Sequence, residues 1–412
     1  MPINCIYDEK DANFQNKLDL FNKDIIKYRT GRLLIKTEPN QIVEIEQIKH
    51  EFIFGSAISS EIFSDYNKMY REMYFKIFQD NFNYAVHENA LKWTTNEDEQ
   101  GKHNFKIADE ITKYCLINQI PIRGHCLFWS ISEKNPTWVS KLDQDELSIV
   151  IKNRITEVIN RYRQTIIEYD VINEMTHGDF FIRKYNDNGI ISNIYKWTYQ
   201  VDSSLHLYVN DYNILTGEKT TDYIQQINSL LLNGAPIHGI GCQGHFIKNY
   251  FSESEINQVL GRLAKFNLPI KITEFDIDTK NEKQKAKSLE MLFHIFFANP
   301  AVEGIILWGF WEGAHWHPNA ALWKINFEIT PAGLVYRNIV FDKWWTKWKG
   351  VTNENGECEL QAYYGDYLLR FGEHSIKFSF KHDKELVIID SAKAVAAHCD
   401  IIRLNTDEAT IY

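Results

Sequence analysis

The sequence predicts an α/β protein built on a closed (β/α)8 TIM barrel, with a small β-rich unit formed by the N- and C-terminal segments. Short apolar, β-rich runs recur at starts about 29–45 residues apart, which leaves room for a crossover helix each time. Eight runs are present, at residues 52–58, 81–86, 121–129, 166–173, 205–211, 237–243, 268–275 and 302–310. Eight alternating units favour a closed barrel over an open doubly wound sheet.

The segments between these runs have the periodicity of amphipathic helices. Apolar residues recur at i, i+3, i+4 and i+7 over residues 152–163 and again over residues 285–297. No GxGxxG pattern follows the first run, so the main argument for a dinucleotide-binding fold is missing. The sequence therefore calls for no cofactor.

The two ends of the chain have alternating, strand-like patterns instead. We predict an N-terminal β-rich segment at residues 1–50, a catalytic barrel at 51–348 and a C-terminal β-rich segment at 349–412 that packs with the N-terminal one. A turn is expected at NENGE, residues 353–357. This β unit could bind sugar or simply pack against the barrel.

Composition excludes several classes of partner. The net charge is −10, from 45 basic and 55 acidic residues, which argues against nucleic-acid binding through phosphates. No apolar run approaches the roughly 18–20 residues of a membrane span.

The first residues lack a signal-peptide pattern. We expect a cytoplasmic protein if the chain is complete, and a secreted one if a signal was removed. Oligomeric state is not predicted.

Polar and aromatic side chains follow the predicted strands at the point where each strand ends. Because the carboxyl ends of barrel strands face one mouth, these side chains should meet there. They include His87, Glu88, Asn89, Lys92, His125, Trp129, Asn173, Glu174, Asn210, Asp211, Tyr212, Gln243, His245, Glu274, Asp276, Trp308, Trp311, Glu312, His315 and Trp316.

The residue types at the mouth favour glycosidic bond cleavage. HExxH does not occur, and the spacing of His125, His245 and His315 gives only weak support for a zinc site. The GxSxG pattern of a serine nucleophile is absent. Two carboxylates on separate strands, Glu174 and Glu274, can protonate a leaving oxygen and attack an anomeric carbon. Indoles can stack on sugar rings, while amides and imidazoles bond hydroxyls.

Seven motifs occur in order: HENALKW (87–93), RGHCLFW (123–129), DVINEM (170–175), NDYN (210–213), GIGCQGHF (239–246), ITEFDI (272–277) and LWGFWEG (307–313). From about residue 50 to 350 the chain resembles glycoside hydrolase family 10, the endo-1,4-β-xylanase family, whose fold is this barrel. DVINEMTHGDFF and GIGCQGHF are most similar to a plant-like branch of the family.

The resemblance implies hydrolysis of internal xylosidic bonds of xylan, or of xylo-oligosaccharides, with retention of configuration. Glu174 would be the general acid/base and Glu274 the nucleophile, with carboxyl groups about 5–5.5 Å apart. Asn173 would bond the 2-hydroxyl of the reacting sugar, and His245 would keep Glu274 ionised. The resemblance also implies that His125 and Trp129 line the reacting subsite, and that Glu88, Asn89 and Lys92 bind the next sugar towards the non-reducing end. Trp308 and Trp316 would cover the cleft as a roof, and Gln243 would contact sugar. Tyr212 would be a stacking platform on the leaving-group side.

Three departures from the family pattern bear on the polymer preference. Ser130 stands where many members carry a second His, Gly244 replaces a common Ser, and residues 311–323 differ from the usual loop after the eighth strand. A related hydrolase of another β-glycan or of short oligosaccharides therefore stays open as an alternative, as does a sugar-binding barrel without activity. The presence of both glutamates argues against the last.

Overall fold

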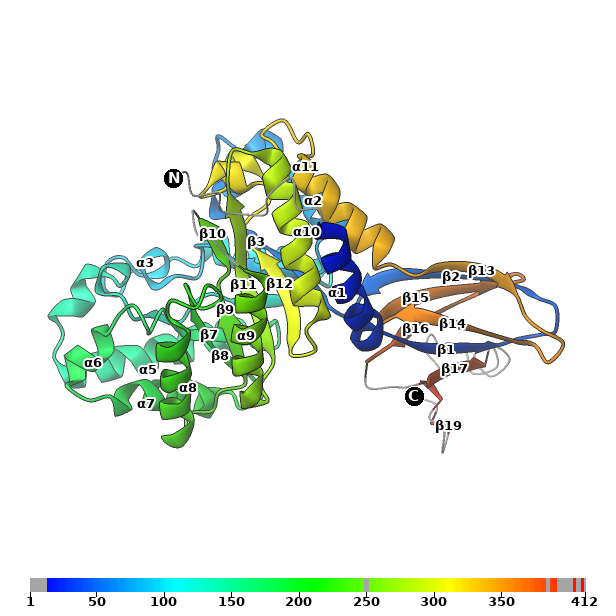
Figure 1. The fold of residues 1–412 in the computed structure, drawn as a ribbon. Helices are drawn as coiled ribbons and strands as arrows, with labels where there is room; N and C mark the ends of the chain where they lie inside the picture. Colours follow the sequence, from blue (N-terminus) through cyan, green and yellow to red (C-terminus); the bar gives the residue numbers. More distant parts are fainter. Residues whose placement is uncertain (1–12, 248–251, 383–385, 391–402, 405–408, 411–412) are drawn as a thin grey trace. The chain divides into compact units, whose positions relative to one another are not determined.

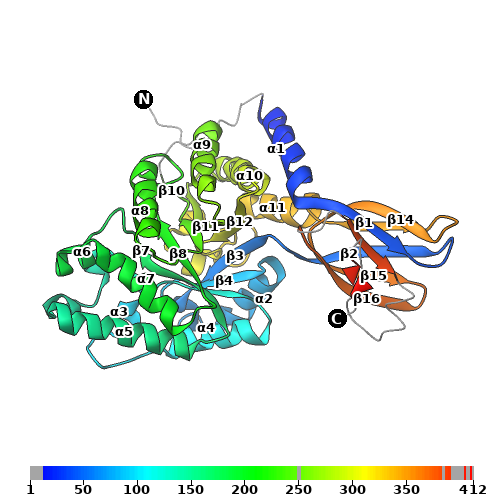
Figure 2. The same ribbon diagram turned by 90° about the horizontal axis from the view of Figure 1, so that it is seen from below.

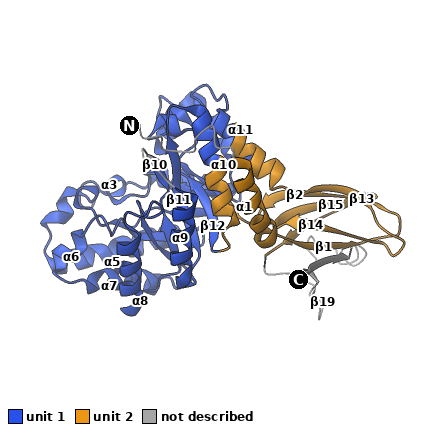
Figure 3. Cartoon of the chain, viewed as in Figure 1, with its two compact units in different colours: residues 1–9, 54–289, 301–333 blue, residues 10–53, 290–300, 334–412 orange. Residues whose placement is uncertain are grey.

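The structure is a computed structural model that describes residues 13–247, 252–382, 386–390, 403–404 and 409–410 (Figure 1). Its described residues fall into two compact units (Figure 3). The first contains those within residues 54–289 and 301–333, and the second contains residues 13–53, 290–300 and those from 334 onward.

The first unit is a closed barrel of parallel strands, as the sequence predicts. Its strands follow chain order around the ring, and pairing of β11 with both β9 and β12 closes it. The strands are β3 (Ile53–Ile58), β4 (Tyr84–His87), β5 (Ile122–Gly124), β7 (Ile166–Asn173), β8 (His206–Asp211), β9 (Gly239–Cys242), β11 (Ile270–Asp278) and β12 (Val302–Leu307), with short additions β6 (Phe128–Trp129) and β10 (His245–Ile247) at two ends.

Helices surround these strands (Figure 2). They are α2 (Arg71–Asn81), α3 (Trp93–Asn96), α4 (Lys106–Ile117), α5 (Gln144–Arg161), α6 (Phe180–Tyr185), α7 (Gly189–Val201), α8 (Thr220–Leu232) and α9 (Glu253–Leu263). Two further helices, α10 (Glu282–Ala298) and α11 (Pro331–Asn338), are divided between the first and the second unit. Among the described helices, none combines the length and the apolar character needed to cross a bilayer.

Local sequence explains why these elements begin and end where they do. Helix α5 starts at a capping box, in which the Asp143 carboxylate accepts from the Glu146 backbone and the Glu146 carboxylate accepts from the Asp143 backbone. Strand β7 is buried at all but one of its residues, as expected for a strand inside a barrel. The run predicted at 121–129 differs from the expectation, because it divides into β5 and β6 around His125.

The second unit contains strands from both ends of the chain, as predicted. Strand β1 (Thr30–Lys36) pairs with β14 (Glu357–Tyr363) and β17 (Leu386–Asp390), and β2 (Ile42–His50) pairs with β13 (Lys347–Val351) and β15 (Gly365–Phe371). The remaining strands are β16 (His374–Phe380), β18 (Arg403–Leu404) and β19 (Ala409–Thr410). The expected turn at 353–357 is present, with Gly356 at φ +75°.

Two features of this unit bear on the sequence prediction. Residues 14–29, which lie in the segment predicted to be β-rich, form helix α1 (Phe14–Arg29) instead. Inward side chains such as Leu33, Ile45 and Phe378 form an apolar core. Outward side chains form exposed ion pairs, including Arg32 with Glu359, Lys36 with Glu357, Lys349 with Glu44 and Arg370 with Glu46.

A buried charge network lies inside the barrel, on β5, β7 and β11. Arg123 donates to Asp170 and to Glu168, and Lys271 donates to the second oxygen of Glu168. All four side chains are buried. Burial alone would raise the pKa of Glu168, but Lys271 and Arg123 outweigh it and lower that pKa.

Breaking this network should destabilise the barrel. In Lys271→Met, Glu168 loses one of its two cationic partners while it stays buried, so we expect the free energy of unfolding to fall by about 3–5 kcal/mol. The matched control is Lys76→Met, which breaks an exposed pair with Asp80 and should cost less than about 1 kcal/mol. Urea unfolding of both variants measures the difference, and equal losses would contradict the prediction.

Candidate active site

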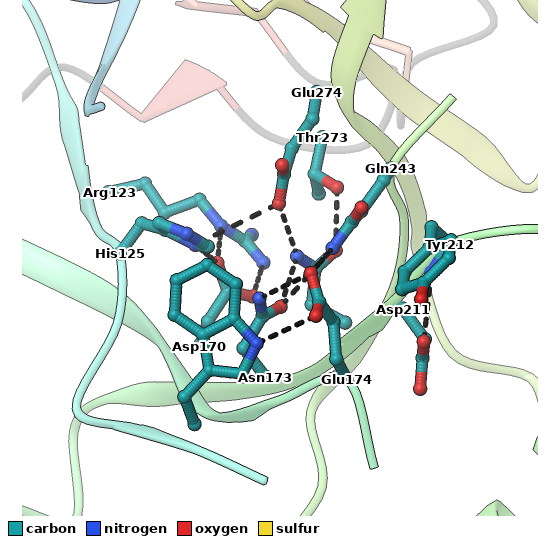
Figure 4. Close-up of polar contacts among 12 residues, drawn as sticks. Arg123, His125, Asp170, Asn173, Glu174, Asp211, Tyr212, Gln243, Thr273 and Glu274 are labelled. Atoms are coloured by element: carbon teal, nitrogen blue, oxygen red, sulfur yellow. Dashed lines mark hydrogen bonds and ion pairs between the residues drawn. The ribbon is translucent and has the colours of Figure 1, made fainter. Parts of the chain in front are cut away.

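The carboxyl ends of the barrel strands bring the predicted residues together in one polar cluster (Figure 4). Asn173 ends β7 and Glu174 follows it, Asn210 and Asp211 end β8, Gln243 follows β9, and Glu274 is the central residue of β11. Glu174 and Glu274 are both buried, and their carboxyl groups point into this cluster.

Glu274 sits among donors that favour its ionised form. One oxygen accepts the Asn210 amide at 2.7 Å, and the other lies 3.2 Å from His245 Nε2. His125 Nδ1 lies 3.9 Å from the first oxygen. Burial works to raise the pKa of Glu274, but His125 and His245 outweigh it and hold the pKa below its usual value.

The pKa of Glu174 is shifted in the opposite direction, to a higher value. The Trp129 indole donates to one oxygen at 2.7 Å, and Gln243 donates to the other at 3.0 Å. These bonds act to lower the pKa of Glu174, but burial outweighs them and, with the negative charge of Glu274, raises it. The two glutamates thus have the pKa separation that an acid and a nucleophile need.

Side-chain amides connect the two carboxyl groups. Asn210 Nδ2 donates to Glu274 and also, at 2.9 Å, to Asn173 Oδ1. Asn173 Nδ2 lies 3.2 Å from the Glu174 oxygen that Gln243 also contacts. The Asn210 amide is oriented in turn by the Thr273 hydroxyl, which donates to its oxygen at 2.6 Å. This orientation leaves the nitrogen of Asn210 facing Glu274.

His245 connects Glu274 to the predicted roof. Its Nδ1 lies 3.1 Å from Asp276, and the Trp316 indole donates to the other Asp276 oxygen at 2.6 Å. Burial acts to lower the pKa of His245, but Asp276 and Glu274 outweigh it and raise the pKa to about 10. His245 is therefore an imidazolium at neutral pH, and Trp316, which is half exposed, is connected through Asp276 and His245 to Glu274.

A second histidine, His125, is oriented by Asp170 of the buried charge network. His125 Nδ1 lies 2.9 Å from Asp170, which also accepts from Arg123. The His125 ring meets the Trp308 ring edge to face at 5.0 Å between centroids. The buried charge network of the barrel interior thus ends at the predicted site.

The residues predicted to bind the next sugar lie together, with Lys92 beside Trp129. The Lys92 ammonium is 4.8 Å from the Trp129 ring and donates to Asn89 at 2.7 Å. Glu88 is buried beside them; burial raises its pKa, and Ser59 and Lys92 act against that rise. Lys92 therefore connects Asn89 to Trp129, whose indole donates to Glu174.

Tyr212 lies on the other side of Glu174. Burial and the negative charge of Glu174 both raise the pKa of Tyr212. Its ring stacks on that of His177, which the sequence analysis did not select; the stack has 3.6 Å between centroids. Sequence reasoning missed His177, Asp170 and Arg123 as neighbours of the predicted site residues. Their signals were present, since His177 lies in DVINEMTHGDFF and the other two lie in motifs already named.

The departures noted in the sequence have structural reasons. Gly244 has φ +85°, and a Cβ there would lie 2.6 Å from Ile272, so a serine would not fit this backbone. Residues 311–323 are held by His317, 3.1 Å from Asp278, and by Lys285, which donates to the carbonyls of Asn319 and Ala321. Within the described ranges, no group of three or more His, Cys, Asp or Glu side chains is arranged to hold a metal ion.

Comparison with known proteins agrees with this geometry. The sequence model of glycosyl hydrolase family 10 matches residues 45–340. Endo-1,4-beta-xylanase 1 of Arabidopsis thaliana is 35% identical over 354 residues, covering 83% of this chain and 36% of the relative. Anti-sigma-I factor RsgI6 of Acetivibrio thermocellus is 34% identical over 329 residues, covering 80% of this chain and 42% of the relative. The chain thus spans about two fifths of the length of these curated relatives.

Solved structures show the same barrel. Xylanase 10B from Thermotoga petrophila, in complex with xylobiose, superposes with a TM-score of 0.64 at 25% identity, covering 71% of this chain and 95% of that one. An intracellular xylanase from Thermoanaerobacterium saccharolyticum superposes with a TM-score of 0.62 at 26% identity, covering 69% and 95%. With the family match spanning most of the barrel, the chain belongs to glycosyl hydrolase family 10.

Proposed function

We propose that this chain is a retaining endo-β-1,4-xylanase, with residues 51–348 as its catalytic barrel. One observation carries the proposal: two buried glutamates share one hydrogen-bond network, and their pKa values are shifted in opposite directions. The family and the names of the xylanase relatives support xylan or xylo-oligosaccharides as the substrate.

In the first step Glu274 attacks the anomeric carbon while Glu174 protonates the leaving oxygen. The lowered pKa of Glu274 keeps it a carboxylate, and the raised pKa of Glu174 keeps it an acid. Asn173 and Gln243 are placed to bond hydroxyls of the reacting sugar. Trp308 and Trp316 close over it, and His125 and Trp129 line its subsite. Glu88, Asn89 and Lys92 bind the next sugar towards the non-reducing end.

In the second step water attacks the glycosyl ester and Glu174 acts as the base. Because the negative charge of Glu274 raises the pKa of Glu174, that pKa should fall when Glu274 is esterified. Trapping the intermediate with a 2-deoxy-2-fluoro substrate and titrating ¹³C-labelled Glu174 by NMR tests this. An unchanged pKa after trapping would contradict the coupling.

The pH dependence of kcat/KM should have two limbs. Activity should rise through the pKa of Glu274, below 4.5, and fall through that of Glu174, above 4.5. His245→Gln removes a positive charge beside Glu274, so the pKa of Glu274 should rise and the acidic limb should move to higher pH. The alkaline limb belongs to Glu174 and should move much less. A profile whose acidic limb stays in place would show that His245 does not ionise Glu274.

A product profile tests the function itself. Chromatography with time on xylan, arabinoxylan, β-glucan and cellulose should show xylo-oligosaccharides from the xylans, and none from the Glu174→Ala and Glu274→Ala controls. Proton NMR of the first product should show the β-anomer before mutarotation. Release mainly from β-glucan would instead indicate a related hydrolase of another β-glycan. Binding of xylohexaose by calorimetry without any release would indicate a sugar-binding barrel.

A further inference from the structure

The stacked pair of His177 and Tyr212 joins two loops at the barrel mouth. His177 follows β7 by four residues and Tyr212 directly follows β8. Their ring planes differ by 12° and their centroids are 3.6 Å apart, so the imidazole covers one face of the phenol ring. A sugar that stacks on Tyr212 must therefore use the opposite face.

One buried carboxylate holds both members of the pair. Asp211 Oδ1 lies 2.7 Å from His177 Nδ1 and accepts the Tyr212 backbone N–H at 2.9 Å. Its other oxygen accepts the Thr176 backbone N–H at 2.7 Å. Because a carboxylate accepts, His177 Nδ1 carries a hydrogen and the imidazole cannot rotate away without losing this bond. Asp211 is fully buried, so water does not compete for it.

The turn that carries His177 is itself fixed to Glu174. The Glu174 carbonyl accepts the N–H groups of His177 and Gly178, at 3.2 and 3.0 Å. The Ser130 hydroxyl donates to the Gly178 carbonyl at 2.8 Å, and a Cβ at Gly178 would lie 2.4 Å from the Ser130 backbone. The departure at Ser130 thus belongs to the same arrangement: its hydroxyl bonds the turn, and the missing side chain of Gly178 lets the turn pack closely on the backbone of residue 130.

We propose that His177 is a positioning residue that, with Asp211, fixes the plane of Tyr212 on the leaving-group side of the cleft. The sugar that leaves is then stacked with its glycosidic oxygen facing Glu174. This inference rests on the proposed function and deepens it, because it names the side chain that orders the leaving-group subsite. A misplaced platform should reduce rate on substrates that occupy this side by about 10- to 100-fold.

The test compares two substrates that differ only on the leaving-group side. Xylohexaose places sugars on Tyr212, whereas β-xylobiosyl fluoride has no sugar there and releases fluoride. His177→Ala should lower kcat/KM for xylohexaose by about 10- to 100-fold and should lower it much less for the fluoride. His177→Phe keeps a stacking ring but loses the bond to Asp211, so its loss should be intermediate. His206→Ala, an exposed histidine at the other end of β8, is the matched control.

A double-mutant cycle separates positioning from a general structural role. If His177 acts through Tyr212, then His177→Ala should cause little further loss in a Tyr212→Ala background. Equal losses on both substrates, additive losses in the cycle, or no loss at all would each overturn the proposal. If the wild type cleaves neither substrate, the proposed function fails. In that case the positioning proposal is tested by the affinity for xylohexaose, measured by calorimetry. Weaker binding by His177→Ala than by the wild type supports the proposal, and equal affinity overturns it.

Discussion

Replacing Glu274 by Gln should lower kcat by about 10⁵-fold or more, the scale seen when a covalent nucleophile is removed. Glutamine has nearly the shape of the side chain, but its single amide oxygen can accept from only one of Asn210 and His245, which face different oxygens of Glu274. It cannot attack the anomeric carbon. The fold should be unaffected, which circular dichroism and thermal unfolding check. The matched control is Glu303→Gln, an exposed glutamate on β12, which should keep full activity.

The anomeric configuration of an azide product tests specifically whether Glu274 is the nucleophile. In Glu274→Ala, azide can enter the space that the carboxylate leaves and attack the anomeric carbon of an activated xylobioside from the same face. The product would be the α-xylobiosyl azide, formed without a glycosyl-enzyme. NMR identifies the anomer, and a β-azide from this variant would show that Glu274 is not the nucleophile.

Replacing Glu174 by Ala should lower kcat/KM for xylohexaose by about 10²- to 10⁴-fold, the usual contribution of general acid catalysis. The loss should be far smaller for formation of the glycosyl-enzyme from β-xylobiosyl fluoride, whose leaving group needs little protonation. Hydrolysis of the intermediate should slow because the base is missing, so the intermediate should accumulate in a burst. Stopped-flow release of fluoride and mass spectrometry of the protein measure both effects.

Reaction with azide distinguishes the role of Glu174 as a base from its role as an acid. In Glu174→Ala the glycosyl-enzyme still forms on Glu274, and azide attacks it from the opposite face to give the β-azide. The alkaline limb of the pH profile should also disappear, because it reports the ionisation of Glu174. Equal slowing on the fluoride and on xylohexaose would contradict the acid role.

Local sequence patterns were sufficient to predict the barrel and the polar side chains at its mouth. Strand β7 could be predicted to the residue because an apolar run, interrupted only by Glu168 and Asp170, ends at Asn173-Glu174. Helix α1 was missed because only Leu18 and Ile25 are buried along it, and two residues seven apart give a weak helical signal.

The contacts that tune the site could not be predicted in the same way. The bond from Trp316 to Asp276 and the stack of His177 on Tyr212 each join two loops, and loop conformation depends on tertiary contacts rather than on periodicity. The charge network of Arg123 and Lys271 was missed for another reason. Each charged residue sits inside an apolar run, where sequence alone does not show that its partner lies on another strand.

The pairing of the terminal strands has a consequence for the order in which the chain folds. In the described structure, every strand that pairs with β1 or β2 begins at residue 347 or later; Thr30, for example, lies opposite Tyr363. During synthesis, the ribosome therefore releases β1 and β2 long before any partner exists, and the whole barrel emerges in between. The barrel can fold first as a unit. Until the C-terminal strands are synthesised, the backbone N–H and C=O groups of β1 and β2 have no strand partner. A chain truncated just after the barrel would leave those strand edges exposed permanently.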